Sequence, residues 1–314
     1  MLQQQVLKLA SLQRVVMLNL VEIYQKRYKQ FLAVTFVLLL VFSGILIFNK
    51  ISTGEFIEKD VSLTGGTLIT VHSDTEFDLQ ELESAVGQEL DSSVNVRKLQ
   101  ALGGASVGYS FTIKEGIDTD AALAAIGNSG LDVSDGKYTI EQASSTISET
   151  FWKNTLIAVA IAFAAMSVVV LIYFRSLVPS LAVILASASD LLGTLAVMNI
   201  LGIDLSIGGV AALLMIIGYS VDTDILLTTK LLRRTETDVS ERIRSSVKTG
   251  LTMQLTAIAA MAVLYFVSPA EVLKQIAAIL MIGLALDIPF TWIQNIGIML
   301  LYLEKKEGKK DVKA

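Results

Sequence analysis

Six long runs of apolar residues constrain the fold of this chain more than any other feature. A helix that crosses a membrane needs about 20 predominantly apolar residues. Runs close to or above that length cover residues 31–48, 151–174, 178–201, 205–232, 250–267 and 276–303. Hydrophobic residues make up 53% of the 314 residues and charged residues only 18%, too little charge for a soluble surface. The sequence therefore predicts a polytopic α-helical membrane protein with six transmembrane helices.

Lysine and arginine residues near the ends of these runs indicate the orientation of the chain, because cytoplasmic loops are enriched in them. They gather before the first run, at Arg175, between the fourth and fifth runs, and after the sixth run. Alternating crossings place all four groups on one side, so we expect a multi-pass protein of the cytoplasmic membrane with both termini cytoplasmic. The expected parts are a cytoplasmic segment 1–30, a transmembrane helix 31–49, an extracytoplasmic domain 50–150, a five-helix transmembrane domain 151–303 and a basic cytoplasmic tail 304–314.

The interval between the first and second helices has the pattern of a small folded domain. Its elements follow the order β-α-β-β-α-β, which is typical of a ferredoxin-like α+β domain. Asp74 or Asp78 can cap the first helix, because aspartate accepts hydrogen bonds from free amide groups at helix starts. Turns are expected at Gly103-Gly104 and Asp135-Gly136. Alternation and helical spacing predict strands at 67–71, 94–99, 107–113 and 137–142, and helices at 78–90 and 121–126.

The exported interval is acidic, in contrast to the cytoplasmic segments. Residues 51–150 contain seventeen Asp and Glu against five Lys and Arg, a net charge of −12. Two interpretations remain open. The acidic side chains can form an ordinary solvated surface opposite the positive cytoplasmic side, or they can bind a basic partner on the outer face.

The glycine pair at the start of this domain and the few metal-binding residue types limit the chemistry. Gly65 and Gly66 precede a predicted strand, which favours a sharp turn over a phosphate-binding loop, since that loop needs a following helix. The chain has no Cys and a single His, His72, so neither a disulfide framework nor a zinc site is expected. We expect no metal, no cofactor and no catalytic residue.

Four aspartates lie inside the apolar runs, where an ionisable side chain costs several kcal/mol and marks a function or a buried partner. They are Asp190 in the third run, Asp222 and Asp224 in the fourth, and Asp287 in the sixth. No Lys or Arg lies deep in a run; the nearest are Lys230 and Lys248 at the cytoplasmic ends. Four such carboxylates would not all stay charged, so these aspartates are the candidate groups for proton or ion coupling. The alternative for each is a structural hydrogen bond to a neighbouring polar side chain.

Helical geometry ranks these candidates. Asp222 and Asp224 lie about 200° apart on a helical wheel, so only one can face a given neighbour. Gly218 shares the face of Asp222 and permits close approach of another helix, so we expect Asp222 to be the main carrier. Asp224 should matter less and Asp287 should be intermediate. Pro289 predicts a kink in the sixth helix, followed by the polar residues Thr291, Gln294 and Asn295.

The order of the segments and two motifs resemble a known family. The chain has one predicted span, then an exported domain and then five further spans. This layout resembles that of the SecF subunit of the SecD–SecF protein-export complex. Leu63-Thr64-Gly65-Gly66-Thr67 resembles that family's Asp-Phe-Thr-Gly-Gly-Thr signature, with Ser62 in place of its Asp. Gly218-Tyr219-Ser220-Val221-Asp222-Thr223-Asp224 resembles the motif of its fourth span, with Thr223 where bacterial members have an Asp. Lys248 stands where bacterial members have an Arg. A separate chain with acids at these places resembles the archaeal branch.

The resemblance implies membership of the resistance-nodulation-division superfamily and a role as an auxiliary subunit of the general protein-secretion machinery. It implies that the chain promotes polypeptide export with SecD, beside the SecYEG channel, and is coupled to an ion gradient, the proton motive force. The implied partners are SecD, SecYEG, the translocating polypeptide and membrane lipids, with no nucleic acid. The number of predicted spans agrees with this implied partner. Such transporters have two related halves with the site between them, and the six spans of this chain supply one half.

Three other functions stay open. A homodimeric small-molecule or lipid exporter of the same superfamily would carry a larger exported domain with a binding cleft. An intramembrane aspartyl protease would use Asp222 and Asp287 as facing carboxylates that share a proton, but the glycine-x-glycine-aspartate signature of such proteases is not found before Asp287. A structural membrane assembly factor would need none of these acids to titrate.

Overall fold

The computed structural model describes residues 2–73, 75–92, 94–100, 106–134, 136–232, 238–268 and 270–311. The chain forms two compact units. The helical unit comprises Met1–Glu58, Val159–Ile203 and Gly208–Ala314, and the α+β unit comprises Lys59–Ala158 and Asp204–Ile207. The predicted turn at Gly103-Gly104 and the residues Asp74 and Asp135 lie outside the described residues.

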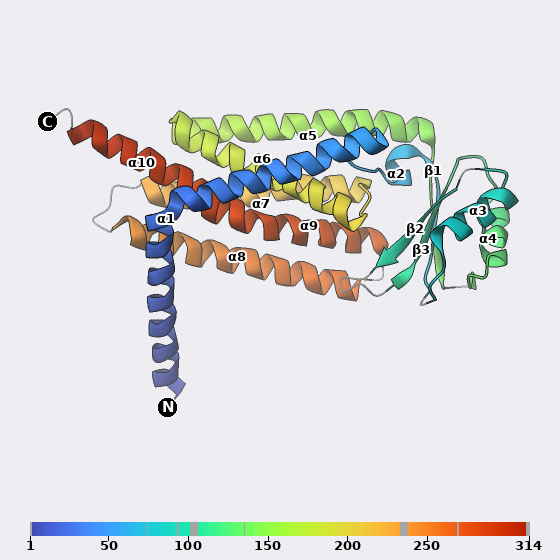
Figure 1. Ribbon diagram of the computed structural model, residues 1–314, viewed down its shortest axis with the longest axis horizontal. Helices are drawn as coiled ribbons and strands as arrows, with labels where there is room; N and C mark the ends of the chain where they lie inside the picture. The colour runs from blue at the N-terminus through green and yellow to red at the C-terminus, as the bar shows by residue number, and fades with distance from the viewer. Residues whose placement is uncertain are drawn as a thin grey trace. The chain divides into compact units, whose positions relative to one another are not determined.

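Long helices form the helical unit (Figure 1). Among the described residues, six segments are long and apolar enough to cross a membrane, which confirms the predicted number. These segments are Val21–Thr53, Thr150–Phe174, Leu177–Leu201, Ile207–Leu232, Val239–Val267 and Val272–Lys306. The corresponding helices are α1 (Leu2–Thr53), α5 (Ser145–Phe174), α6 (Leu177–Leu201), α7 (Ile207–Leu232), α8 (Val239–Val267), α9 (Glu271–Pro289) and α10 (Ile296–Asp311).

The third, fourth and sixth of these segments form the interior of the helical unit. About half of the α6, α7 and α9–α10 segments is buried, whereas α5 and α8 are largely exposed. The helix α6 packs against both α1 and α9, and α8 packs along α9. Two helices of this unit depart from regular α-helical geometry. The first is α1, which has a non-helical backbone at Arg27, so it consists of two helices that meet at a kink before the first span.

The second irregularity lies in the middle of the sixth span, where the sequence predicted a kink at Pro289. The chain stays helical there but widens into a π-helical turn, η1 (Phe290–Asn295), between α9 and α10. Proline has no amide hydrogen to donate and crowds the preceding turn, so a local change of helical geometry at this point has a direct cause. Short π-helical turns are frequent at functional sites. All but one of the described side chains of η1 are buried.

The α+β unit has the predicted element order. Its sheet pairs β1 (Gly66–Val71), β2 (Val94–Gln100), β3 (Ser106–Ile113) and β4 (Tyr138–Ala143) in the order β2-β3-β1-β4, and each pairing is antiparallel. The helices α3 (Leu79–Glu89) and α4 (Thr119–Asn128) pack on the sheet around a core that includes Ile69, Val86, Phe111 and Ile126 (Figure 1). The Asp78 side chain caps α3 by accepting from the amides of Gln80 and Glu81. This is the ferredoxin-like domain that the sequence predicted.

A short helix and a glycine pair lead into the sheet. The helix α2 (Val61–Thr64) is capped by Asp60, whose carboxylate accepts from the Ser62 amide at 3.2 Å. Gly65 and Gly66 both have positive φ angles, and a Cβ on Gly66 would lie 2.5 Å from the Ile113 carbonyl oxygen. The two glycines therefore have a steric reason to be glycine, as the turn interpretation expected.

The connection between α6 and α7 belongs to this unit as well. The Asp204 carboxylate forms an ion pair with Arg97 of β2. The Leu205 carbonyl oxygen accepts from the Asp60 amide at 3.0 Å, and the Ile207 amide donates to the Ser62 hydroxyl at 3.2 Å. The α6–α7 turn is thus held by the residues around α2 and by β2 through both backbone and side-chain contacts.

Candidate coupling site within the helical bundle

Three of the four predicted acids lie together in the interior of the helical unit. The side chains of Asp190 on α6, Asp224 on α7 and Asp287 on α9 are at most 1% exposed. The fourth, Asp222, is exposed on the outer side of α7. The wheel separation of about 200° between Asp222 and Asp224 thus places them on opposite sides of α7, and it is Asp224 that faces the other two acids.

The fourth-span motif is divided between these two sides of α7. Tyr219 is 44% exposed, and a Cβ on Gly218 would meet no atom within 4 Å. Ser220 is buried and points the other way. Its hydroxyl donates to Oδ2 of Asp190, and the Ser187 hydroxyl lies 3.3 Å from that of Ser220. The motif therefore supplies one inward polar contact from Ser220 and an open outer face around Gly218.

Asp287 accepts from a glutamine that a tryptophan holds in place, and neither residue was singled out from the sequence. The Gln254 side-chain amide on α8 donates to Oδ2 of Asp287, and the Trp292 indole nitrogen donates to the Gln254 side-chain oxygen at 2.8 Å. An indole N–H can only donate, so this contact fixes which end of the Gln254 amide faces the carboxyl group. The Trp292 ring lies against Gly250 of α8, where a Cβ would overlap the ring. Gln254 is a polar residue inside an apolar run, and that was the available signal.

Asp224 is linked to Asp287 by the polar residues of the π-helical turn. Its Oδ1 atom accepts from the Asn295 amide at 2.7 Å and lies 3.0 Å from the Thr291 hydroxyl. The same Thr291 hydroxyl lies 2.7 Å from Oδ1 of Asp287. Gln294, the third predicted polar residue, donates to the Ser189 hydroxyl of α6 at 3.2 Å. The turn η1 therefore contacts polar groups of α6, α7 and α9.

Several oxygen atoms in this network make no hydrogen bond to another described residue. They are Oδ1 of Asp190, Oδ2 of Asp224, the hydroxyl of Thr228, and the side-chain oxygens of Gln294 and Asn295. Buried oxygens of this kind are uncommon, since an unpaired buried polar group costs about 1–3 kcal/mol. The buried carboxyl groups therefore lie among further oxygen atoms from α6, α7 and η1. Within the described part of the chain, no group of three or more His, Cys, Asp or Glu residues could hold a metal ion.

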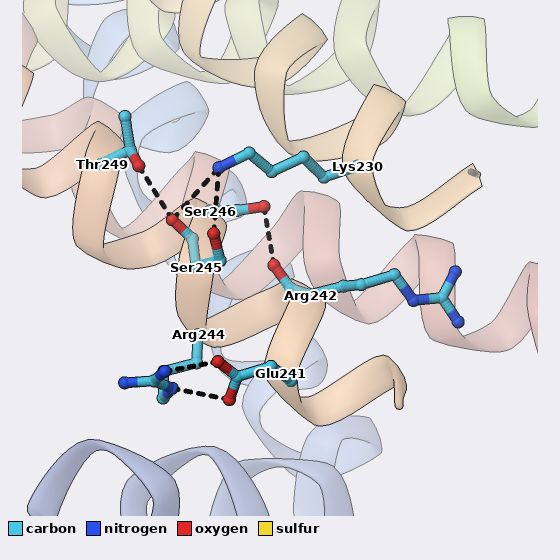
Figure 2. Close-up of polar contacts among 7 residues, drawn as sticks. All are labelled: Lys230, Glu241, Arg242, Arg244, Ser245, Ser246 and Thr249. Atoms are coloured by element: carbon cyan, nitrogen blue, oxygen red, sulfur yellow. Dashed lines mark hydrogen bonds and ion pairs between the residues drawn. The ribbon is translucent and has the colours of Figure 1, made fainter. Parts of the chain in front are cut away.

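The lysine and arginine side chains nearest to the buried acids in the sequence contact other residues instead of these acids. Lys230, near the end of α7, donates to the carbonyl and hydroxyl oxygens of Ser245 on α8, both at 3.2 Å (Figure 2). Arg242 of α8 donates to the Leu231 carbonyl at 2.9 Å. Arg244 pairs with Glu241 on the same turn of α8 (Figure 2). The contacts of Lys230 and Arg242 join the C-terminal end of α7 to the start of α8. Lys248 is exposed on α8.

The bundle with its buried acids and the ferredoxin-like domain define a polytopic membrane protein with a folded α+β unit, and comparison with known proteins identifies the family. A family model described as protein export membrane protein SecD/SecF, C-terminal, matches residues 128–305. The protein-export membrane protein SecF of Pyrococcus furiosus is 38% identical over 266 residues, which cover 85% of this chain and 88% of the relative. SecF of Methanocaldococcus jannaschii is 37% identical over 295 residues, 91% of this chain and 99% of the relative. The chain belongs to the SecD/SecF family of protein-export membrane proteins, which confirms the resemblance seen in the sequence.

Solved structures show the same fold. SecDF from Thermus thermophilus, described as a translocon-associated membrane protein, superimposes with a TM-score of 0.69 at 20% sequence identity, covering 90% of this chain and 38% of that one. A second SecDF structure, in a super-membrane-facing form, gives a TM-score of 0.60 at 18% identity, covering 93% and 40%. The chain therefore spans about two fifths of the length of these SecDF chains.

Proposed function

We propose that this chain is the SecF-type half of a complex with SecD that uses an ion gradient to promote polypeptide export through the SecYEG channel. The observation that carries the proposal is the group of three buried carboxyl groups on α6, α7 and α9. Ionisable groups inside a membrane-spanning bundle are costly and are kept where a proton or ion pathway needs them. The lysine and arginine distribution supports a place in the cytoplasmic membrane with both termini inside the cell.

The outer face of α7 supports SecD as the partner. Asp222, Gly218 and Tyr219 lie exposed on this face, and a carboxylate that faces lipid costs several kcal/mol. A second subunit would cover Asp222, and the glycine would let its helix approach closely. Gly218→Leu should weaken co-purification with SecD and leave the fold of this chain intact, since nothing lies near that position.

The roles of the acids can then be separated by their positions. Asp222 lies where SecD would contact α7, so it is the candidate carrier at the interface between the halves. Asp224 and Asp287 share the Thr291 hydroxyl and form the candidate carriers within this chain. Asp190 contacts Asp287 directly, and the Ser220 hydroxyl of the fourth-span motif adjoins both of these acids. This arrangement gives the inner pair more weight in the coupling than the sequence alone suggested.

The proposal is tested by export of a secreted substrate into inverted membrane vesicles that contain SecYEG, SecD and this chain, with the ion gradient imposed or collapsed. Asp222→Asn, Asp224→Asn and Asp287→Asn remove the ionisable group and keep a hydrogen-bonding oxygen. Each should lose the stimulation by the gradient at matched protein level. Asp120→Asn, on the exposed surface of α4, is the matched control and should behave like the wild type.

Two results would contradict the proposal. Vesicles without this chain could export the substrate with the same response to the gradient. Alternatively, all three variants could keep the full response, in which case the buried acids would have a structural role only.

A further inference from the structure

The Thr291 hydroxyl has one hydrogen and two carboxyl neighbours. It lies 2.7 Å from Oδ1 of Asp287 and 3.0 Å from Oδ1 of Asp224, both within hydrogen-bonding distance. A hydroxyl group donates a single hydrogen, and an ionised carboxylate donates none. When one of the two carboxyl groups is protonated, it donates to the Thr291 oxygen while the hydroxyl donates to the other carboxylate, and both contacts are then full hydrogen bonds. The geometry therefore fits a single proton held in this three-residue chain.

The remaining contacts hold both carboxyl groups in place. Asp287 also accepts from Gln254, whose orientation is fixed by Trp292. Asp224 also accepts from Asn295 at 2.7 Å. Because these partners are amide and indole donors, they fix the position of each carboxyl group whether or not it carries the proton. The extra proton can reside on either acid without rearrangement of the residues around it.

The position of Thr291 departs from the usual behaviour of threonine in a helix, where the hydroxyl bonds to the carbonyl oxygen four residues earlier. Thr194 does this with Asp190 at 2.7 Å, and Thr223 does it with Tyr219 at 3.0 Å. The Thr291 hydroxyl contacts the side chain of Asp287, not its carbonyl oxygen, and reaches across to α7. It lies in the π-helical turn η1 directly after Pro289.

We propose that Thr291 relays a proton between Asp287 on α9 and Asp224 on α7. In one direction, the O–H bond of protonated Asp287 breaks and the released proton forms a bond with the Thr291 oxygen. At the same time, the original hydroxyl proton of Thr291 passes to Oδ1 of Asp224. The threonine is unchanged at the end, Asp287 has become a carboxylate and Asp224 a carboxylic acid. All three side chains are at most 1% exposed, so the hydroxyl supplies the contact that water would supply at a surface.

The relay rests on the proposed coupling to a gradient and adds that protons cross this step. Thr291→Val keeps the shape and removes the hydroxyl, whereas Thr291→Ser keeps the hydroxyl. In the vesicle assay with SecYEG and SecD, under an imposed proton gradient, export by Thr291→Val should fall to the level measured without the gradient. Thr291→Ser should recover the stimulation. Thr194→Val, which removes a buried hydroxyl bonded only within its own helix, should respond like the wild type.

The outcomes separate this inference from the proposed function. A wild-type response from Thr291→Val, beside a lost response from Asp224→Asn, overturns the relay and leaves the coupling role. Failure of Thr291→Ser to recover the stimulation also overturns it, because any hydroxyl at this position should suffice. A wild-type response from both Thr291→Val and Asp224→Asn removes the relay and the coupling role together.

A second measurement does not depend on the folding of Thr291→Val. Infrared spectra of the purified wild-type complex at neutral pH should contain the C=O stretching band of a protonated carboxylic acid. The double variant Asp224→Asn/Asp287→Asn should lose that band, and the Asp120→Asn control should keep it. The relay would be overturned if the spectra of the wild type and of the double variant were the same in the region of the carboxylic acid band.

Discussion

Asp60 should make the stability of the α+β unit depend on pH in a direction opposite to that of an ordinary surface carboxylate. Burial, together with the nearby Glu141 and Asp204, raises the pKa of Asp60 from its ordinary 3.8 to about 6, although the Ser62 amide acts in the opposite direction. The unfolded chain releases the Asp60 proton near pH 4, and the folded domain holds it until about pH 6. This contribution to stability is therefore fully present below pH 4 and is lost as the pH rises through 6.

The size of the effect follows from the two pKa values. One pKa unit corresponds to about 1.4 kcal/mol, so the free energy of unfolding should fall by about 3 kcal/mol in total, most of it between pH 4 and pH 7. Asp60→Asn removes the titration and retains an oxygen that can cap α2, because asparagine is as good a capping residue as aspartate. The variant should be more stable than the wild type above pH 6, by up to about 3 kcal/mol, and should gain nothing at pH 4.

Pulse proteolysis of the whole chain in detergent across a urea series would measure this difference for the α+β unit. Asp132→Asn is the matched control in the same unit. Lys137, 2.5 Å from the Asp132 carboxylate, and Ser134 lower the pKa of that group to about 2. Its stabilisation is present above the ordinary pKa and is lost as the pH falls, so Asp132→Asn should lower the stability at neutral pH. The same gain from Asp60→Asn at pH 4 and pH 7 would refute the reasoning.

Two further predictions concern the orientation of the chain and the packing of the bundle. Single cysteines introduced at Ser92 and Ser240 should react with an impermeant thiol reagent from opposite sides of sealed vesicles, because the lysine and arginine pattern puts residues 50–150 outside; reaction from the same side would contradict the six-span topology. Gly250→Leu should destabilise the bundle by about 1–3 kcal/mol in thermal unfolding, because any Cβ there overlaps the Trp292 ring. Gly44→Leu, at an open position on α1, should have little effect.

The elements of the α+β unit could be predicted because their signals are local. Alternation along residues 67–71 predicts β1, and the Asp78 cap marks the start of α3, where the structure has them. The element order then restricts the sheet to few arrangements. The helix α2 was not predicted, since four residues are too few for a periodic pattern. The structure also gives residues 2–30 as part of α1, where the apolar residues form no long run.

The buried acids were visible in the sequence, but most of their partners were not. A charged residue in an apolar run stands out by itself, which is why Asp190, Asp224 and Asp287 were found. Their contacts with Gln254 and Trp292 join α8 to α9 and η1, and no spacing rule relates residues on separate helices. The contacts of the π-helical turn could not be predicted for the same reason. Pro289 predicts an irregularity, but the register in which Thr291 meets two acids follows only from how α7 packs against that turn.

The choice between Asp222 and Asp224 shows why a helical wheel cannot orient a membrane helix. In a soluble protein, the apolar stripe of a helix marks its buried side. In a bilayer the lipid is as apolar as the bundle interior, so apolar residues cover both sides of α7 and the wheel fixes relative angles only. The small residue Gly218 favours a helix contact on the side of Asp222, whereas Ser220 and Asp224 meet polar partners on the other side. Both faces of α7 therefore have the features of a contact surface. A helix that lies between its own bundle and a second subunit needs such features on both faces.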